Sequence, residues 1–329
     1  MDLRKLISFG KGSYILSMPK GWIEENNLKK GDLISIDDGG FELVLRAGQP
    51  ILKQELKEVS IDTKDKNIEF LKTEIVSSYL NGFDTINIHF EGNPREMLRI
   101  KDIIRNLSGL EIMEQTSSRI IAKNLINLNE ISINNIIRRM DIITRAMIED
   151  AMLCCKDKGI YDDILHRDID VNRLYFLGYR VIKHAMKNPR AAKMLQLEPW
   201  QLHGDMVMIL EIEKIADRQK RIARIFSRFN FDRQTIEALE GVYHTIGESY
   251  NEVMKAYYNN DKSGAFSTET TIKDKNAACN KLLENYAGLH KPKNKESAAN
   301  QLAMAQIIEN MKGTCAEIKN IARNVLCYE

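Results

Sequence analysis

Hydrophobic residues from residue 131 onward recur at the three- and four-residue spacing of amphipathic α-helices. In the first such stretch, 131–153, one helical face carries Ile133, Ile136, Met140, Ile143 and Met147. The same periodicity predicts further helices over 162–187, 197–228, 232–258, 265–289 and 295–327. Breaks between them fall at 157–159, 187–189, 230–232, 259–261 and 290–292. Long helices with short connections favour antiparallel bundles, and two consecutive groups of three suggest an internal duplication.

The preceding stretch, residues 52–127, alternates between strand and helix patterns. Helices are predicted over 67–82, which Gly82 ends, and over 93–109, which Asn93 and Pro94 begin. The order βαβαββ predicts a small α+β domain whose helices cover one face of a sheet. The predicted strands of this domain are 58–63, 85–92, 110–115 and 119–127.

Residues 1–48 have the pattern of a small β module around a short helix. Two short strands are expected before Pro19, because proline cannot continue a paired central strand. A helix over 20–27 follows, and Asp38-Gly39-Gly40 then predicts a hairpin turn between strands 32–36 and 41–46. The module is too short to bury a core by itself.

Composition and charge are those of an ordinary soluble globular protein. The 329 residues suit two or three domains, and 43% of them are hydrophobic and 29% charged. A net charge of +2 excludes a strongly basic nucleic-acid binder overall, although it leaves room for a local basic face. No apolar run approaches the roughly 20 residues that span a bilayer, and residues 1–5 lack the apolar core of a signal peptide.

The side chains that commonly carry chemistry form no catalytic pattern. The 6 histidines show no metal-binding spacing, and the segment 10–13 lacks the second half of a phosphate-binding loop. We therefore expect no enzymatic activity. An odd cysteine count without Cys-x-x-Cys spacing predicts reduced thiols and a cytoplasmic location. The 5 cysteines are Cys154, Cys155, Cys279, Cys315 and Cys327.

The segment GKGSYILSMPKGWIEENNLKKGDLISI, residues 10–36, resembles the AbrB/SpoVT swapped-hairpin domain. That family has the order strand, proline, short helix, Leu-x-x-Gly-Asp and strand. The resemblance implies that two chains interleave their hairpins into one barrel. A homodimer through residues 1–48 would then supply the core that one copy lacks.

The helical part resembles the PhoU family of phosphate-uptake regulators. The resemblance rests on IRRMDIITRAMIEDA at 137–151, HRDIDVNRLYFLGYRVI at 166–182 and LEIEKIADRQKRIA at 210–223. An AbrB-like head joined to PhoU-like bundles is similar to the archaeal version of these regulators. The implied fold is multidomain, with a swapped-hairpin β head, an α+β middle domain and a pair of all-α three-helix bundles. The corresponding domains are 1–48, 49–128, 129–230 and 231–329.

The AbrB-like head implies DNA binding by basic side chains. The implied contacts are Arg4, Lys5, Lys11 and Lys20, with Ser13 and Tyr14 beside them. The head departs from the family, because Ile23 and Glu24 replace the arginine pair of its short helix. Across residues 1–48, 7 basic residues are matched by 7 acidic ones, so the segment is formally neutral. The alternative is that the head serves only to dimerise the chain.

The PhoU-like bundles imply metal binding by carboxylates four residues apart, which share one helical face. Glu213 and Asp217 keep this pattern, whereas Asp168 has Asn172 as its partner. The implied metal on the first bundle is iron, zinc or magnesium. The alternative is ordinary ion pairs, since Lys214, Arg218 and Lys220 lie nearby. In the second bundle the corresponding stretches, Asp274 to Ala278 and Glu309 to Gly313, lack the second carboxylate.

Arg173 and Arg180 lie seven residues apart on one face and are weaker candidates for phosphate or an acidic partner. Together these features predict a cytoplasmic, homodimeric, DNA-binding regulator of phosphate uptake. Its expected partners are DNA and a phosphate transporter or phosphate-sensing protein. The alternative is an adaptor that docks on a transporter ATPase or sensor protein without binding DNA. A metal-dependent enzyme ranks last.

Overall fold

The computed structural model describes residues 3–38, 43–48, 56–91, 94–289 and 295–327. The chain divides into two compact units, Met1–Leu56 and Lys57–Glu329, each of which is considered by itself. Several predicted features lie outside the described residues. These are Gly39-Gly40 of the hairpin turn, Asn93 before the second helix of the middle domain, and the break at 290–292.

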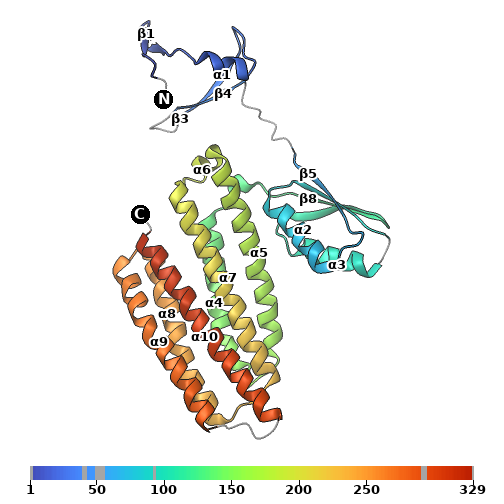
Figure 1. Ribbon diagram of the computed structural model, residues 1–329, viewed down its shortest axis with the longest axis vertical. Coiled ribbons are helices and arrows are strands. Elements are labelled where there is room, and N and C mark those ends of the chain that lie inside the picture. The colour runs from blue at the N-terminus through green and yellow to red at the C-terminus, as the bar shows by residue number, and fades with distance from the viewer. Residues whose placement is uncertain (1–2, 39–42, 49–55, 92–93, 290–294, 328–329) are drawn as a thin grey trace. The chain divides into compact units, whose positions relative to one another are not determined.

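The first unit consists of two antiparallel hairpins and a short helix (Figure 1). Strands β1 (Ile7–Phe9) and β2 (Ser13–Ile15) pair with each other, as do β3 (Ile34–Asp38) and β4 (Leu43–Ala47). Helix α1 (Lys20–Glu25) begins directly after Pro19 and lies between the hairpins in sequence. These elements follow the order that the sequence pattern predicts.

This unit buries no core of its own. Among residues 3–36 and 43–48, no side chain is buried. A hairpin pair that leaves this much apolar surface in water is not expected to be stable alone. Its large exposed apolar residues are Leu3, Leu6, Ile7, Phe9, Tyr14, Ile15, Leu16, Leu33, Ile36, Leu43 and Leu56.

The second unit begins with a four-stranded sheet in the order β5-β6-β8-β7. Strand β5 runs parallel to β6, and the remaining neighbours are antiparallel, with a bulge between Ile112 and Glu114. Asn67 caps the first helix by accepting a hydrogen bond from the Phe70 amide at 2.8 Å. The elements are β5 (Glu58–Asp62), α2 (Ile68–Leu80), β6 (Thr85–His89), α3 (Pro94–Arg105), β7 (Leu110–Gln115) and β8 (Arg119–Asn124).

Alternate residues of these strands face the two helices. Ile86, Ile88 and Ile120 are fully buried, and they pack with Ile75 and Ile100 of the helices in one apolar cluster. The opposite face of the sheet carries mainly polar side chains. This is the α+β arrangement that the alternating pattern predicts.

The rest of the unit is helical, and each predicted long helix is present within three residues of its expected ends. Pro189 does more than break a helix, because it also starts the short helix α6. None of the described helices combines the length and hydrophobicity needed to cross a membrane. After a 3₁₀ turn at Leu128–Glu130, the helices are α4 (Ile133–Leu153), α5 (Ile160–Lys187), α6 (Pro189–Met194), α7 (Pro199–Arg228), α8 (Arg233–Asn259), α9 (Lys262–Leu289) and α10 (Lys295–Cys327).

The long helices lie side by side and share one hydrophobic core (Figure 1). Helix α7 packs against α4, α5 and α10, and α10 packs against α7, α8 and α9. A buried polar chain joins three of these helices. Gln219 donates to Thr314 Oγ1 at 3.2 Å, and the Tyr243 hydroxyl lies 2.6 Å from Gln219 Oε1. Such satisfied buried bonds fix how the helices pack against one another.

Arg180 joins the middle domain to α5. Its guanidinium donates to the Tyr79 carbonyl at 2.8 Å and the Phe83 carbonyl at 3.1 Å, and it stacks on the Tyr79 ring. Lys183 donates to Asn81 Oδ1 at 2.8 Å one helical turn later. Arg180 is only 2% exposed, so the expectation that it attracts phosphate is wrong. A buried guanidinium needs hydrogen-bond partners, and the Tyr79 and Phe83 carbonyls supply them, so Arg180 has a structural role.

Candidate functional site

The predicted metal-binding residues lie on facing helices, two on α5 and two on α7. Asp168 Oδ2 accepts a hydrogen bond from Asn172 Nδ2 at 3.1 Å. The Lys220 ammonium lies 2.9 Å from Asp168 Oδ2 and 2.8 Å from Asp217 Oδ1. Lys220 of α7 therefore joins Asp217 of its own helix to Asp168 of α5, and its pair with Asp168 links the two helices. We call Asp168, Asn172, Glu213, Asp217 and Lys220 the carboxylate–lysine cluster.

Burial and crowding shift the pKa values of this cluster. Burial, then the charges of Asp217 and Asp168, raise the pKa of Glu213 to about 7. Burial also raises the pKa of Asp168, although the hydrogen bond and charge of Lys220 oppose this change. For Lys220, burial lowers the pKa, but its bonds to both aspartates outweigh burial and raise it overall. Near neutral pH, the cluster contains a protonated lysine between two carboxylates and a Glu213 that is partly protonated.

This arrangement bears directly on the predicted metal. Divalent cations prefer carboxylate oxygens that are free of other cations. Here the Lys220 ammonium contacts one oxygen of Asp168 and one of Asp217, and Arg221 lies 2.6 Å from the other oxygen of Asp217. No group of three or more His, Cys, Asp or Glu residues in the described part of the chain is placed to hold a metal. As arranged, the residues fit an internal cation better than a metal, and binding of iron, zinc or magnesium stays a prediction.

A second cation of α7, Arg218, pairs with a carboxylate of α10. Arg218 donates from Nε and Nη2 to the two Glu317 oxygens, at 2.8 and 2.9 Å. The guanidinium crosses directly over Gly313, where an added Cβ would lie 1.9 Å from Arg218 Cζ. A side chain at position 313 would therefore collide with the Arg218 guanidinium. Helix α7 thus supplies Lys220 to α5 and Arg218 to α10.

The predicted DNA-binding residues all lie on the exposed surface of the first unit. Lys11 lies in the turn between β1 and β2, and Ser13 begins β2. Lys20 begins α1 and forms an exposed 3.5 Å ion pair with Glu24 of the same helix. Arg4 and Lys5 precede β1. These side chains are accessible to a polyanion, but Glu24 offsets part of their charge.

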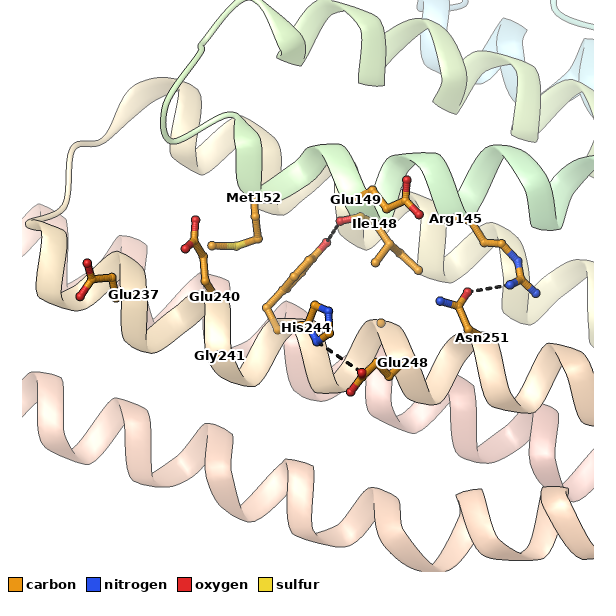
Figure 2. A pocket seen from close by; sticks show the side chains of 12 residues that line it. Arg145, Ile148, Glu149, Met152, Glu237, Glu240, Gly241, His244, Glu248 and Asn251 are labelled. Carbon is orange, nitrogen blue, oxygen red and sulfur yellow. Dashed lines mark hydrogen bonds and ion pairs between the residues drawn. The ribbon is translucent and has the colours of Figure 1, made fainter.

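A groove between α4 and α8 was not predicted from the sequence (Figure 2). Its volume is about 620 Å³, and Figure 2 shows side chains from both helices around it. The signal that could have indicated it is the acidic face of α8, where glutamates between residues 237 and 248 recur at helical spacing. The acidic side chains at the groove are Glu149, Glu237, Glu240 and Glu248.

Comparison of the sequence with models of known protein families, and with curated proteins, finds no match. Among solved structures, the chain is similar to PhoU from Pseudomonas aeruginosa, with 13% sequence identity and a TM-score of 0.50. The similarity covers 59% of this chain and 93% of that chain. The segment from α4 to α10, Ile133 to Cys327, makes up about the same share of this chain as the similarity covers. More than half of the chain therefore has a PhoU-like fold, as the resemblance implied, whereas the AbrB-like head and the archaeal kinship stay predictions.

Proposed function

We propose that this protein is a regulator of phosphate uptake. The observation that carries the proposal is the PhoU-like fold of the helical part, which accounts for nearly the whole of the similar chain. The sequence motifs at 137–151, 166–182 and 210–223 support it independently, since they rest on residue identities and not on the backbone fold. In this proposal the helical part receives the signal and the first unit transmits it.

The first unit dimerises the chain in this proposal. Its exposed apolar side chains include Phe9 at 66%, Ile36 at 61% and Leu43 at 65% exposure. Burying such surface contributes about 25 cal/mol per Å², which a second copy of the same unit can provide. Sedimentation equilibrium of the full chain is expected to give a dimer. Ile36→Glu is expected to give monomers with an unchanged helical spectrum, and a wild-type monomer at micromolar concentration would contradict this assignment.

The dimer binds DNA through its basic side chains. Binding of a labelled fragment of its own promoter is expected to weaken steeply as salt increases. Lys11→Ala and Lys20→Ala are expected to weaken binding to all sequences and to reduce the salt slope by about 1 each per subunit. Lys72→Ala, an exposed lysine of the middle domain, is the control. Absence of salt-sensitive binding by wild type would contradict DNA binding.

A second candidate function is an adaptor that docks on a transporter ATPase or sensor protein. The balance of 7 basic and 7 acidic residues across 1–48 favours it, because a neutral head attracts DNA weakly. The two functions differ in one measurement. That measurement is DNA binding: an adaptor shows no salt-sensitive binding to the promoter fragment, although it still co-purifies with the transporter or sensor after DNA has been digested.

Metal sensing by the carboxylate–lysine cluster is a separate part of the proposal. The test is metal content after purification without chelator, in wild type and in the double variant Glu213→Ala/Asp217→Ala. A site at this cluster predicts bound metal in wild type only. Equal metal content in both proteins would remove the site from the proposal.

A further inference from the structure

The groove between α4 and α8 contains a glycine that helix packing does not require. Gly241 lies in the middle of α8, and an added Cβ would meet no atom within 4 Å. A glycine inside a helix lowers its stability relative to other residues. Gly247, further along the same helix, differs because Ile148 Cγ2 of α4 lies 3.1 Å from its Cβ position. Gly247 lets the helices approach, whereas Gly241 only leaves the groove open.

The groove combines an apolar floor with acidic sides (Figure 2). Ile148 and Met152 of α4 and Tyr243 of α8 form the floor, and each is less than a tenth exposed. The Tyr243 hydroxyl points away from solvent, since it contacts the Ile148 carbonyl at 2.9 Å. Above this floor, Glu149 and Glu248 extend from opposite helices.

The charges around the groove are unevenly balanced. Lys156 pairs with Glu240 at 2.8 Å, and Arg233 pairs with Glu237 at 2.7 Å. These two cations do not line the groove, although their glutamate partners do. Glu248 has His244 at 3.6 Å, which carries a charge only when protonated. Arg145, the cation in the described lining, is bound to Asp141 at 2.8 Å and to Asn251 at 2.7 Å. Among the described residues, Glu149 and Glu248 are therefore the groove carboxylates without a lysine or arginine partner, and a cation from outside could pair with them.

We propose that this groove binds an arginine side chain from a basic segment of a protein partner. The aliphatic part of an arginine suits the apolar floor, and its guanidinium presents five donor hydrogens in a fixed plane to the carboxylates beside the groove. The space over Gly241 admits the side chain. An arginine anchored in a pocket is a common centre of a protein–protein interface. The inference rests on the docking function proposed above and identifies the partner's chemistry.

The test uses a fluorescein-labelled nona-arginine peptide and measures its binding to the full chain by fluorescence anisotropy. Gly241→Leu places a side chain in the open space, where its Cβ meets no atom within 4 Å, and favours the helix, so its melting temperature should equal or exceed that of wild type. Gly288→Leu is the matched control, because Gly288 is also helical and exposed with no atom within 4 Å of its Cβ position. Gly241→Leu is expected to weaken binding about tenfold or more, and the control should bind as wild type does.

Two results would overturn the inference. If wild type does not bind nona-arginine, the groove does not accept this chemistry. If both leucine variants bind as wild type does, the peptide is attracted only by surface charge. A nona-lysine peptide at the same salt concentration is expected to bind more weakly, because an ammonium lacks the planar donor set. Co-purification of a transporter or sensor with Gly241→Leu would leave the adaptor function standing while removing the groove from it.

Discussion

Replacing Lys220 by methionine tests how the carboxylate–lysine cluster is held together. Methionine keeps most of the aliphatic stem and removes the ammonium that lies 2.9 Å from Asp168 and 2.8 Å from Asp217. Two carboxylates on facing helices then lose their shared cation. Asp168 keeps the 3.1 Å hydrogen bond from Asn172, and Asp217 keeps Arg221 at 2.6 Å. The variant therefore weakens the charge balance of the cluster without abolishing it.

The magnitude follows from the exposure of the side chains. Breaking a buried ion pair costs about 3–5 kcal/mol, and breaking an exposed pair about 0–1 kcal/mol. The side chains of Lys220, Asp168 and Asp217 are 25%, 10% and 24% exposed, which places this case between those limits. We expect Lys220→Met to lower the free energy of unfolding by about 2 kcal/mol at pH 7. For a helical part of this size, that is a fall of about 4–8 °C in melting temperature.

The loss should depend on pH. Without the ammonium, burial and the charge of Asp217 raise the pKa of the Asp168 carboxyl in the folded variant further above its unfolded value. The folded variant then binds protons more readily, so the penalty is present at pH 7 and is relieved as the pH falls toward 5. The difference between wild type and Lys220→Met is therefore expected to narrow over that range.

Urea unfolding followed by circular dichroism at pH 5 and pH 7 measures both effects. Lys156→Met is the control, because its 2.8 Å pair with Glu240 is exposed and its loss should lower the free energy of unfolding much less. A Lys220→Met loss no larger than that of the control at pH 7 would refute the reasoning. A loss that stayed constant between pH 5 and pH 7 would refute its electrostatic part.

Further substitutions test the other contacts, each by urea unfolding unless stated. Mn²⁺ should raise the melting temperature of Lys220→Met more than that of wild type, because freed carboxylate oxygens become available to it. Since burial raises the pKa of Glu213 to about 7, ionising this residue destabilises the fold as the pH rises from 4.5 to 7. Glu213→Gln should remove that fall and be more stable than wild type by about 1 kcal/mol at pH 8, but not at pH 4.5. Arg180→Met removes a donor from the Tyr79 and Phe83 carbonyls, of which the Tyr79 carbonyl keeps the Gly82 amide at 3.1 Å, and should cost about 1–3 kcal/mol, with faster hydrogen exchange in α2. Gly313→Ala should cost about 1–3 kcal/mol despite better helix propensity, because its Cβ displaces Arg218.

Periodicity alone predicts most of the elements of the second unit. The three- and four-residue spacing identifies the long helices because each buries one continuous face. The same spacing places Asp168 with Asn172, and Glu213 with Asp217, on single helical faces, as the structure shows. Periodicity does not reveal α6, since Pro189 both ends one helix and begins the next.

Contacts between helices could not be predicted from the pattern. Lys220 and Arg218 are two residues apart, yet they contact α5 and α10 respectively, because successive positions on a helix point in different directions. Arg180 has the spacing of a surface residue and is nevertheless covered by the middle domain. The groove depends on how far α4 and α8 lie apart, which no single helix encodes.

The most direct test of the account removes the gene and follows the uptake of labelled phosphate as external phosphate is raised. A regulator of phosphate uptake predicts that cells without the protein no longer reduce uptake at high phosphate, and that the gene restores this response. Uptake that responds identically in both kinds of cell, with unchanged expression of the transporter, would contradict the proposed function.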